Sequence, residues 1–188
     1  KEPPLKKAYI LLENGNFYEG KSFGINGTSV GEIVFNTSLT GYQEIITDPS
    51  YAGQFITFTM PEIGIVGTNA NDMESKAAFC KGAIVRRYND LHSNYRSEGS
   101  LSDFLKKQNI MGICDVNTRE ITKVLREEGA MMMIASSEIS DKEELKKILS
   151  SSKRIEEINY IEEVSTKESY IHNRSEEHTS ELQSRITI

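Results

Sequence analysis

The chain has 188 residues, of which 37% are hydrophobic and 27% are charged, as expected for one folded domain with room for a tail. Its 22 basic and 28 acidic side chains give a net charge of −6, which disfavours binding to nucleic acid or an anionic membrane. No apolar run approaches the roughly 20 residues of a membrane span, and the N-terminal segment lacks an apolar signal core. These features predict a soluble protein, and the reduced thiols predicted below for Cys80 and Cys114 are typical of the cytoplasm.

The first predicted elements form a β-hairpin. Residues 8–13 are apolar and β-prone, Asn14-Gly15 is a strong signal for a two-residue turn, and residues 16–19 return. Residues 20–31 contain four glycines, so we predict a loop with short extended pieces there.

The later predicted strands are short apolar or alternating runs. In residues 55–60, Phe55, Thr57 and Thr59 alternate with Ile56, Phe58 and Met60, which is consistent with a sheet that has two unlike faces. Pro61 ends this run because proline cannot donate to a strand ladder. The predicted strands after the hairpin cover residues 33–35, 55–60, 83–85, 110–114 and 131–135.

The predicted helices are marked by caps and by an i, i+3, i+4 apolar face. The clearest follows Asn117, which has capping-box spacing to Glu120, and it ends at Gly129. Ser100 caps an earlier helix, and Ser140 with Glu143 caps the last one. The predicted helices cover residues 74–81, 100–108, 117–128 and 141–150. Strands first, then alternating helices and strands, predict a mixed α/β (α+β) domain.

We expect three parts along the chain. Residues 1–150 form the folded domain, and residues 151–173, which are charged with weak periodicity, form a linker. Residues 174–184 read RSEEHTSELQS, whose reverse translation resembles, codon for codon, a widely used short-read sequencing adapter. We therefore expect residues 174–188 to be a translation artefact and exclude them from the fold.

The best candidate for a site is Asp48-Pro49-Ser50. Asp48 can form an Asx turn and Pro49 fixes φ, so the Ser50 hydroxyl is held in a stiff corner. Such a hydroxyl suits hydrogen bonding to the charged end of a small polar substrate. From the residues alone, an ordinary turn serine is the alternative.

Other chemistry-bearing residues give weaker signals. Cys80 and Cys114 lie in apolar surroundings, which predicts buried, reduced thiols rather than a disulfide or a catalytic cysteine. The glycine-rich residues 24–31 lack the lysine of a phosphate-binding loop, so tight turns are favoured there and ATP binding is not supported. No serine lies in a G-x-S-x-G elbow.

Histidine and arginine give no defined site either. His92 stands alone in a polar segment without a second ligand at metal spacing, so we predict no metal site. Arg86, Arg87 and Arg96 could pair with carboxylates at a partner surface, or be ordinary surface arginines.

One segment, residues 31–51 (GEIVFNTSLTGYQEIITDPSY), combines a buried strand pattern with many hydroxyl, amide and glycine residues. It resembles the N-terminal domain of the small, glutamine-hydrolysing subunit of carbamoyl-phosphate synthase almost word for word. The resemblance covers roughly residues 8–171, with further matching pieces in family order. These pieces are residues 54–59, 61–64, 67–69, 74–75, 93–96, 118–119 and 125–126.

The resemblance implies a swivelling β/β/α domain that packs against the large synthetase subunit. In the family, a C-terminal class I amidotransferase domain hydrolyses glutamine with a Cys-His-Glu set. The ammonia reaches the large subunit through a tunnel and yields carbamoyl phosphate for arginine and pyrimidine biosynthesis. Neither the thiol nor its histidine can be placed in residues 1–173, so we expect that domain to be missing and this chain alone to be inactive.

The resemblance also implies a site residue and partners. The serine of the matching D-P-S-Y motif contributes to the glutamine site, so Ser50 is carried over as a substrate-binding residue. Gly41, Tyr42 and Gln43 are assigned only to framework or interface. The implied partners are glutamine and the large subunit, in a heterodimer or higher hetero-oligomer. No cofactor is expected on this chain, and ATP and Mg are expected on the large subunit.

Two other functions are weighed against this one. The first is a stand-alone, non-catalytic interaction domain. The second is a swivelling carrier domain phosphorylated on His92, which is disfavoured because a glycine-rich carrier motif is lacking.

Overall fold

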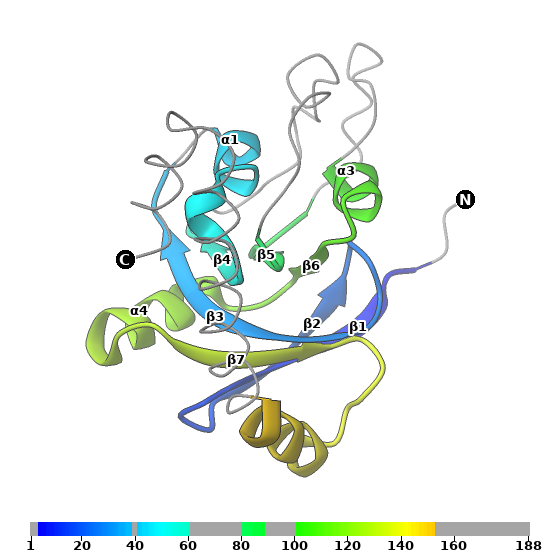
Figure 1. Cartoon of the computed structure of the whole chain (residues 1–188), viewed down its shortest axis with the longest axis vertical. Helices are drawn as coiled ribbons and strands as arrows, with labels where there is room; N and C mark the ends of the chain where they lie inside the picture. The colour runs from blue at the N-terminus through cyan, green and yellow to red at the C-terminus, as the bar shows by residue number, and fades with distance from the viewer. Residues whose placement is uncertain (1–3, 39–40, 61–79, 89–100, 153–188) are drawn as a thin grey trace, which may run out of the picture. The chain divides into compact units, whose positions relative to one another are not determined.

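The computed structural model of the chain describes residues 4–38, 41–60, 80–88 and 101–152. The chain divides into one unit up to Leu149 and a second from Ser150 onward, and the fold below is that of the first. Its strands form a closed barrel in the order β1-β2-β6-β5-β4-β3-β7 (Figure 1). They are β1 (Lys6–Leu12), β2 (Phe17–Ser22), β3 (Thr28–Asn36), β4 (Gln54–Phe58), β5 (Gly82–Ile84), β6 (Met111–Cys114) and β7 (Met131–Ser136).

Helices accompany the barrel, so the predicted mixed α/β class is confirmed. They are α1 (Tyr42–Ile46), the short 3-10 helix η1 (Pro49–Tyr51), α3 (Leu101–Lys107), α4 (Thr118–Glu128) and a further helix over residues 142–152. Strands β3, β4, β5 and β6 run parallel, whereas β1, β2 and β7 pair antiparallel with their neighbours. Parallel neighbours need crossover connections, and α1 with η1 supplies the one between β3 and β4.

The barrel interior forms one apolar cluster. Ile10, Ile33, Phe55 and Met133 come from four different strands, and α4 adds Ile121 to the same cluster. Successive residues of a strand point to opposite faces, so the alternate residues face outward. Helices outside the barrel can therefore pack only against these outward-facing residues.

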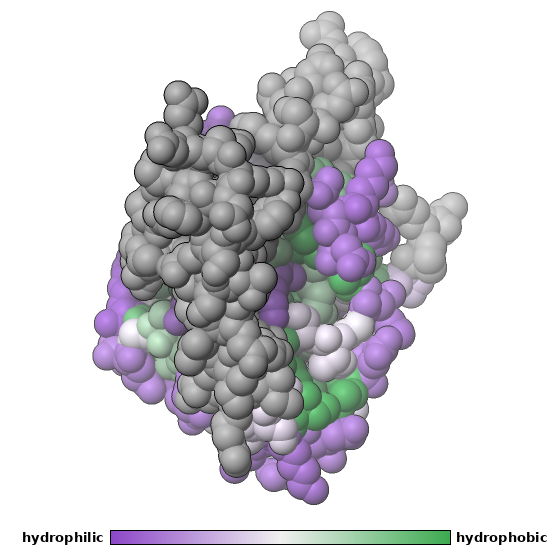
Figure 2. Space-filling view, viewed as in Figure 1, coloured by the Kyte–Doolittle hydropathy of each residue, from purple (hydrophilic) through white to green (hydrophobic). Residues whose placement is uncertain are grey.

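Two apolar clusters lie outside the barrel wall. Ile56 and Phe58 of β4 belong to a cluster that α1 and α3 also join, so β4 is buried on both faces. The two faces of β4 therefore differ in what they pack against: one faces the barrel interior and the other faces α1 and α3. They do not differ in solvent exposure. On the other side, Leu145 and Leu149 pack against Val30. This last helix lies at the bottom of Figure 1, and its exposed face carries lysine and glutamate side chains. Figure 2, in the same view, shows hydrophilic residues along the lower edge.

The first hairpin is confirmed, but its loop is longer than the predicted two residues. Gly15 N–H donates to the Leu12 carbonyl at 2.9 Å, and Leu12 N–H donates to the Asn16 carbonyl at 2.8 Å. Gly15 has φ of 98°, the left-handed conformation that follows a type I turn in three-residue hairpin loops. Asn14 Oδ1 also accepts from Asn16 N–H at 2.9 Å, which favours this longer turn.

The predicted loop over residues 20–31 is wrong at both ends, because β2 continues to Ser22 and β3 begins at Thr28. The glycine-rich composition predicts turns here, yet two of these glycines serve close packing. A Cβ on Gly20 would lie 2.4 Å from the Cys114 carbonyl oxygen, and a Cβ on Gly24 would lie 2.4 Å from Gly112 N. These glycines allow β2 and the segment after it to approach β6.

The cap of α4 is confirmed. Asn117 Oδ1 accepts a hydrogen bond from Glu120 N–H at 3.1 Å, and Gly129, with φ of 88°, ends the helix. The last helix differs from its prediction, since Asp141 Oδ1 accepts from Glu143 N–H at 3.2 Å and takes the capping role assigned to Ser140. An aspartate one residue closer to the helix competes successfully for that position.

Some predictions reach beyond the described residues. The predicted helix 74–81 lies outside them except for Cys80 and Lys81, which are not helical. Ser100, the predicted cap of α3, and residues 153–188 also lie outside. Residues 151 and 152 continue the last helix, and the rest of the linker predicted for 151–173 lies outside the described residues.

Candidate functional site

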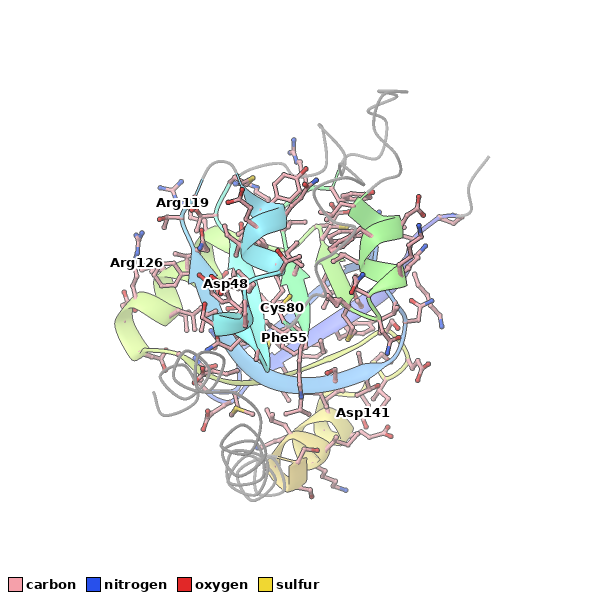
Figure 3. All side chains as sticks on the ribbon, turned by 45° about the horizontal axis from the view of Figure 1, so that its top comes forward. Asp48, Phe55, Cys80, Arg119, Arg126 and Asp141 are labelled. Atoms are coloured by element: carbon pink, nitrogen blue, oxygen red, sulfur yellow. The ribbon has the colours of Figure 1, made fainter. Side chains whose placement is uncertain are left out.

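The Asp48-Pro49-Ser50 corner is a single 3-10 turn. Asp48 is extended, with φ of −78° and ψ of 121°, and its Oδ1 accepts a hydrogen bond from Ser50 N–H at 2.9 Å. Pro49 takes the first helical position, where its fixed φ is favourable. The N–H groups of Tyr51 and Ala52 donate to the Asp48 and Pro49 carbonyls, both at 3.1 Å. The predicted Asx turn is therefore confirmed. Asp48 is labelled in Figure 3.

Ser50, the middle residue of this turn, is exposed. Among the described residues its hydroxyl has no hydrogen-bond partner, while its N–H is already held by Asp48. A hydroxyl carries one donor and two acceptor lone pairs. The corner therefore presents an uncommitted polar group on a fixed backbone.

The helix α1 connects the corner to the core. It follows Gly41, whose φ of 77° is left-handed, and Ile46 is fully buried. The Thr47 hydroxyl donates to the Gln43 carbonyl at 2.9 Å, so the polar end of the helix is satisfied before the corner begins. Tyr42 is half-buried against the core cluster, and this burial raises its pKa.

Asn36, the last residue of β3, holds the corner from the other side. Its Nδ2 donates to the Tyr51 hydroxyl at 3.0 Å, and its Oδ1 accepts from Ser38 N–H at 2.8 Å. Its carbonyl accepts from Thr59 N–H at 3.2 Å. Sequence reasoning missed this residue, because the pattern of Asn36 followed by Ser38 identifies a turn but not the distant tyrosine.

A shallow hollow of about 290 Å³ opens at the carboxyl ends of β5 and β6. It is lined by Arg86, Arg87, Asp115, Val116 and Asn117. Both arginines are exposed, which is consistent with a partner surface and equally with ordinary surface arginines, the two interpretations that the sequence leaves open. Lys21 Nζ lies 3.5 Å from Asp115 Oδ2, with both side chains about half exposed, so this ion pair adds little stability. Arg96 lies outside the described residues.

The two thiols are free and buried, as predicted. Burial raises the pKa of Cys80 and of Cys114 to about 12, so both remain protonated at neutral pH and neither is a thiolate nucleophile. Within the described ranges no three His, Cys, Asp or Glu side chains gather to hold a metal ion. His92 lies outside those ranges.

These thiols predict a pH dependence of stability. The folded pKa of each is about 12 against an ordinary 9, so above pH 9 the unfolded chain loses protons that the folded chain keeps. The stabilisation is complete below pH 9 and is lost as the pH rises toward 12. We expect the free energy of unfolding in urea to fall by up to about 1.4 kcal/mol per pH unit per thiol.

The control is the Cys80→Ala, Cys114→Ala double variant, which retains every tyrosine and lysine. Its unfolding free energy should fall less steeply between pH 9 and pH 10.5. Equal slopes for the two proteins would show that the thiols do not carry this effect.

None of the helices in the described part of the chain has the length and apolarity to cross a membrane. The described residues form a mixed α/β barrel domain with helices packed on the outside of the barrel. This domain presents the polar Asp48-Pro49-Ser50 turn at its surface. The family model for the carbamoyl-phosphate synthase small chain, CPSase domain, matches residues 10–135. The chain belongs to this family, as its sequence resemblance predicted.

Individual relatives agree with the family match. The carbamoyl phosphate synthase small chain of Helicobacter hepaticus is 60% identical over 91% of this chain and 45% of its own length. That of Campylobacter jejuni is 54% identical over 89% of this chain and 45% of its own. That of Vibrio cholerae is 55% identical over 66% of this chain and 33% of its own. The chain thus spans less than half the length of the curated relatives it matches.

Proposed function

We propose that this chain is the N-terminal part of the small subunit of a glutamine-dependent carbamoyl-phosphate synthase. The complete subunit supplies ammonia from glutamine to a large subunit for carbamoyl phosphate synthesis, in the cytoplasm, for arginine and pyrimidine biosynthesis. This chain contributes large-subunit binding and part of the glutamine site. The observation that carries the proposal is the 60% identity to a carbamoyl phosphate synthase small chain over 91% of the residues.

The other parts of the proposal concern the complete protein. A class I amidotransferase domain with the Cys-His-Glu set completes the subunit, and this swivelling β/β/α domain packs on it and on the large subunit. The buried thiols agree with a nucleophile that lies elsewhere, because each has a pKa of about 12. ATP and Mg belong to the large subunit. The chain by itself is inactive in glutamine hydrolysis.

Large-subunit binding is tested with immobilised large subunit. The chain and the complete small subunit are passed over it at matched concentrations, and we expect both to be retained. Retention of neither would overturn the assignment to this heterodimer. Retention of the complete subunit alone would assign the binding surface to residues outside this chain.

We propose that Ser50 contacts glutamine through its hydroxyl. The turn is fixed before ligand arrives, so binding loses little conformational entropy there, and the hydroxyl has no competing partner among the described residues. A hydrogen bond to a charged group of the amino acid is worth about 1.5–3 kcal/mol. Ser50 is therefore expected to affect glutamine affinity more than the fold.

In the complete small subunit assembled with its large subunit, Ser50→Ala is expected to raise the KM for glutamine by roughly tenfold or more. Synthesis from added ammonium should stay at the wild-type rate, because it bypasses glutamine. The control is Ser150→Ala, which removes another exposed serine hydroxyl in the last helix. An unchanged KM in Ser50→Ala would remove Ser50 from the site.

A further inference from the structure

We propose that the Asn36 side chain is a positioning residue for the glutamine site: by holding the Tyr51 hydroxyl it sets the direction of the Ser50 hydroxyl. The inference rests on the proposed function and adds a residue that does not itself touch the substrate. It is carried by a hydrogen bond between the end of β3 and the 3-10 turn, 15 residues apart along the chain.

Asn36 is well placed to act as a fixed support. Its backbone is in the β3–β4 ladder, in register with Phe58, and its carbonyl accepts from Thr59 N–H. Both ends of its side-chain amide are used, one by Ser38 N–H at 2.8 Å and the other by the Tyr51 hydroxyl at 3.0 Å. A side chain bonded at both polar atoms on a ladder residue has little freedom to rotate.

Tyr51 transmits this support to the corner. Its ring is half-buried against the cluster under α1 and α3, and its hydroxyl is held by Asn36, so the side chain is fixed at both ends. The residue before it, Ser50, is held from the other side by the Asp48 carboxylate at 2.9 Å. Ser50 is thus restrained on one side by the bond from its N–H to Asp48 and on the other by Tyr51, which Asn36 holds.

The turn needs such anchors. It consists of three 3-10 residues, and helical segments this short have poor hydrogen-bond geometry and no cooperative stability of their own. The Asp48 bond fixes the Ser50 backbone N–H, whereas the far end of the turn is held by the two backbone bonds from Tyr51 and Ala52 N–H and by side-chain contacts of Tyr51. The Asn36–Tyr51 bond adds a directional restraint at this far end to the packing of the Tyr51 ring.

The experiment uses the complete small subunit assembled with its large subunit. Asn36→Leu and Tyr51→Phe each remove the bond while keeping similar volume. Each is expected to raise the KM for glutamine by about threefold to tenfold, with ammonium-dependent synthesis unchanged. Tyr51→Phe removes only the shared bond, whereas Asn36→Leu also removes the contact with Ser38 N–H, so the double variant should be no worse than Asn36→Leu alone.

Asn36→Asp provides the rescue. A carboxylate can accept from Ser38 N–H, and the Tyr51 hydroxyl can donate to it, so both contacts persist and the KM should stay near that of the wild type. The matched control is Asn14→Leu. Asn14 makes the same turn contact, accepting from Asn16 N–H at 2.9 Å, but it lies in the first hairpin.

A second readout is amide hydrogen exchange at Ser50 and Tyr51 in the wild type and in Asn36→Leu. Faster exchange there, together with the raised KM, supports the inference. A wild-type KM in Asn36→Leu and Tyr51→Phe, while Ser50→Ala raises it, overturns the inference and leaves the proposed function standing. If Ser50→Ala has no effect, the glutamine contact fails and the inference about substrate fails with it, whatever the exchange shows of the turn.

Discussion

Gly24→Ala is expected to destabilise the barrel by roughly 3 kcal/mol or more, a large part of the stability of a typical domain. The added Cβ would lie 2.4 Å from Gly112 N and 2.5 Å from the Ile110 carbonyl oxygen. Both atoms are backbone, and they belong to the segment to which Phe23 and Ile25 donate hydrogen bonds of 2.8 and 3.0 Å. Neither side can retreat without breaking the seam that closes the barrel.

The measurement is urea unfolding followed by circular dichroism, with Gly15→Ala as the control. A Cβ on Gly15 meets nothing within 4 Å, but its φ of 98° strains any residue other than glycine. That strain costs about 1–2 kcal/mol. If Gly24→Ala unfolds at the same or a higher urea concentration than Gly15→Ala, the tight approach to β6 does not limit stability.

Phe55→Ala is expected to cost roughly 3–5 kcal/mol. The ring is fully buried in the barrel interior, shown near the centre of Figure 3, and its removal leaves a cavity between strands that cannot collapse without distorting the closed ring. Urea unfolding measures this loss. A cost below about 1.5 kcal/mol would show that the interior repacks freely.

The neighbouring glycine sharpens this prediction. A Cβ on Gly82 would lie 2.6 and 2.7 Å from two atoms of the Phe55 ring. Gly82→Ala should therefore cost about 1–3 kcal/mol in the wild type and clearly less in a Phe55→Leu background, where the ring is absent. Additive costs would show that the ring is not what confines residue 82.

The elements that the sequence predicted well are those with local signals. Helix α4 is defined by Asn117, Glu120 and Gly129 within the helix and its two caps, and the hairpin by Asn14-Gly15. The Asx turn at Asp48 is equally local, since the carboxylate reaches only two residues ahead. Such contacts depend on near neighbours, which a single sequence displays.

The predictions from sequence fail where the role of a residue depends on a contact with a residue far away along the chain. Gly20 and Gly24 have the same composition signal as turn glycines, and only the position of β6, about 90 residues later, shows that they serve close approach. The bond between Asn36 and Tyr51 is missed for the same reason, because nothing near Asn36 indicates which hydroxyl it meets. Closure of the barrel also depends on a non-local pairing, that of β2 with β6.

The closed ring also affects how this unit associates with other copies of itself. Every strand in the described barrel has two hydrogen-bonded neighbours, because β1 pairs with both β2 and β7. The described barrel therefore has no edge strand, the kind of strand on which a foreign strand usually adds at the start of fibril growth. In this barrel the protection that other sheets gain from charged residues along an edge strand is expected from closure itself.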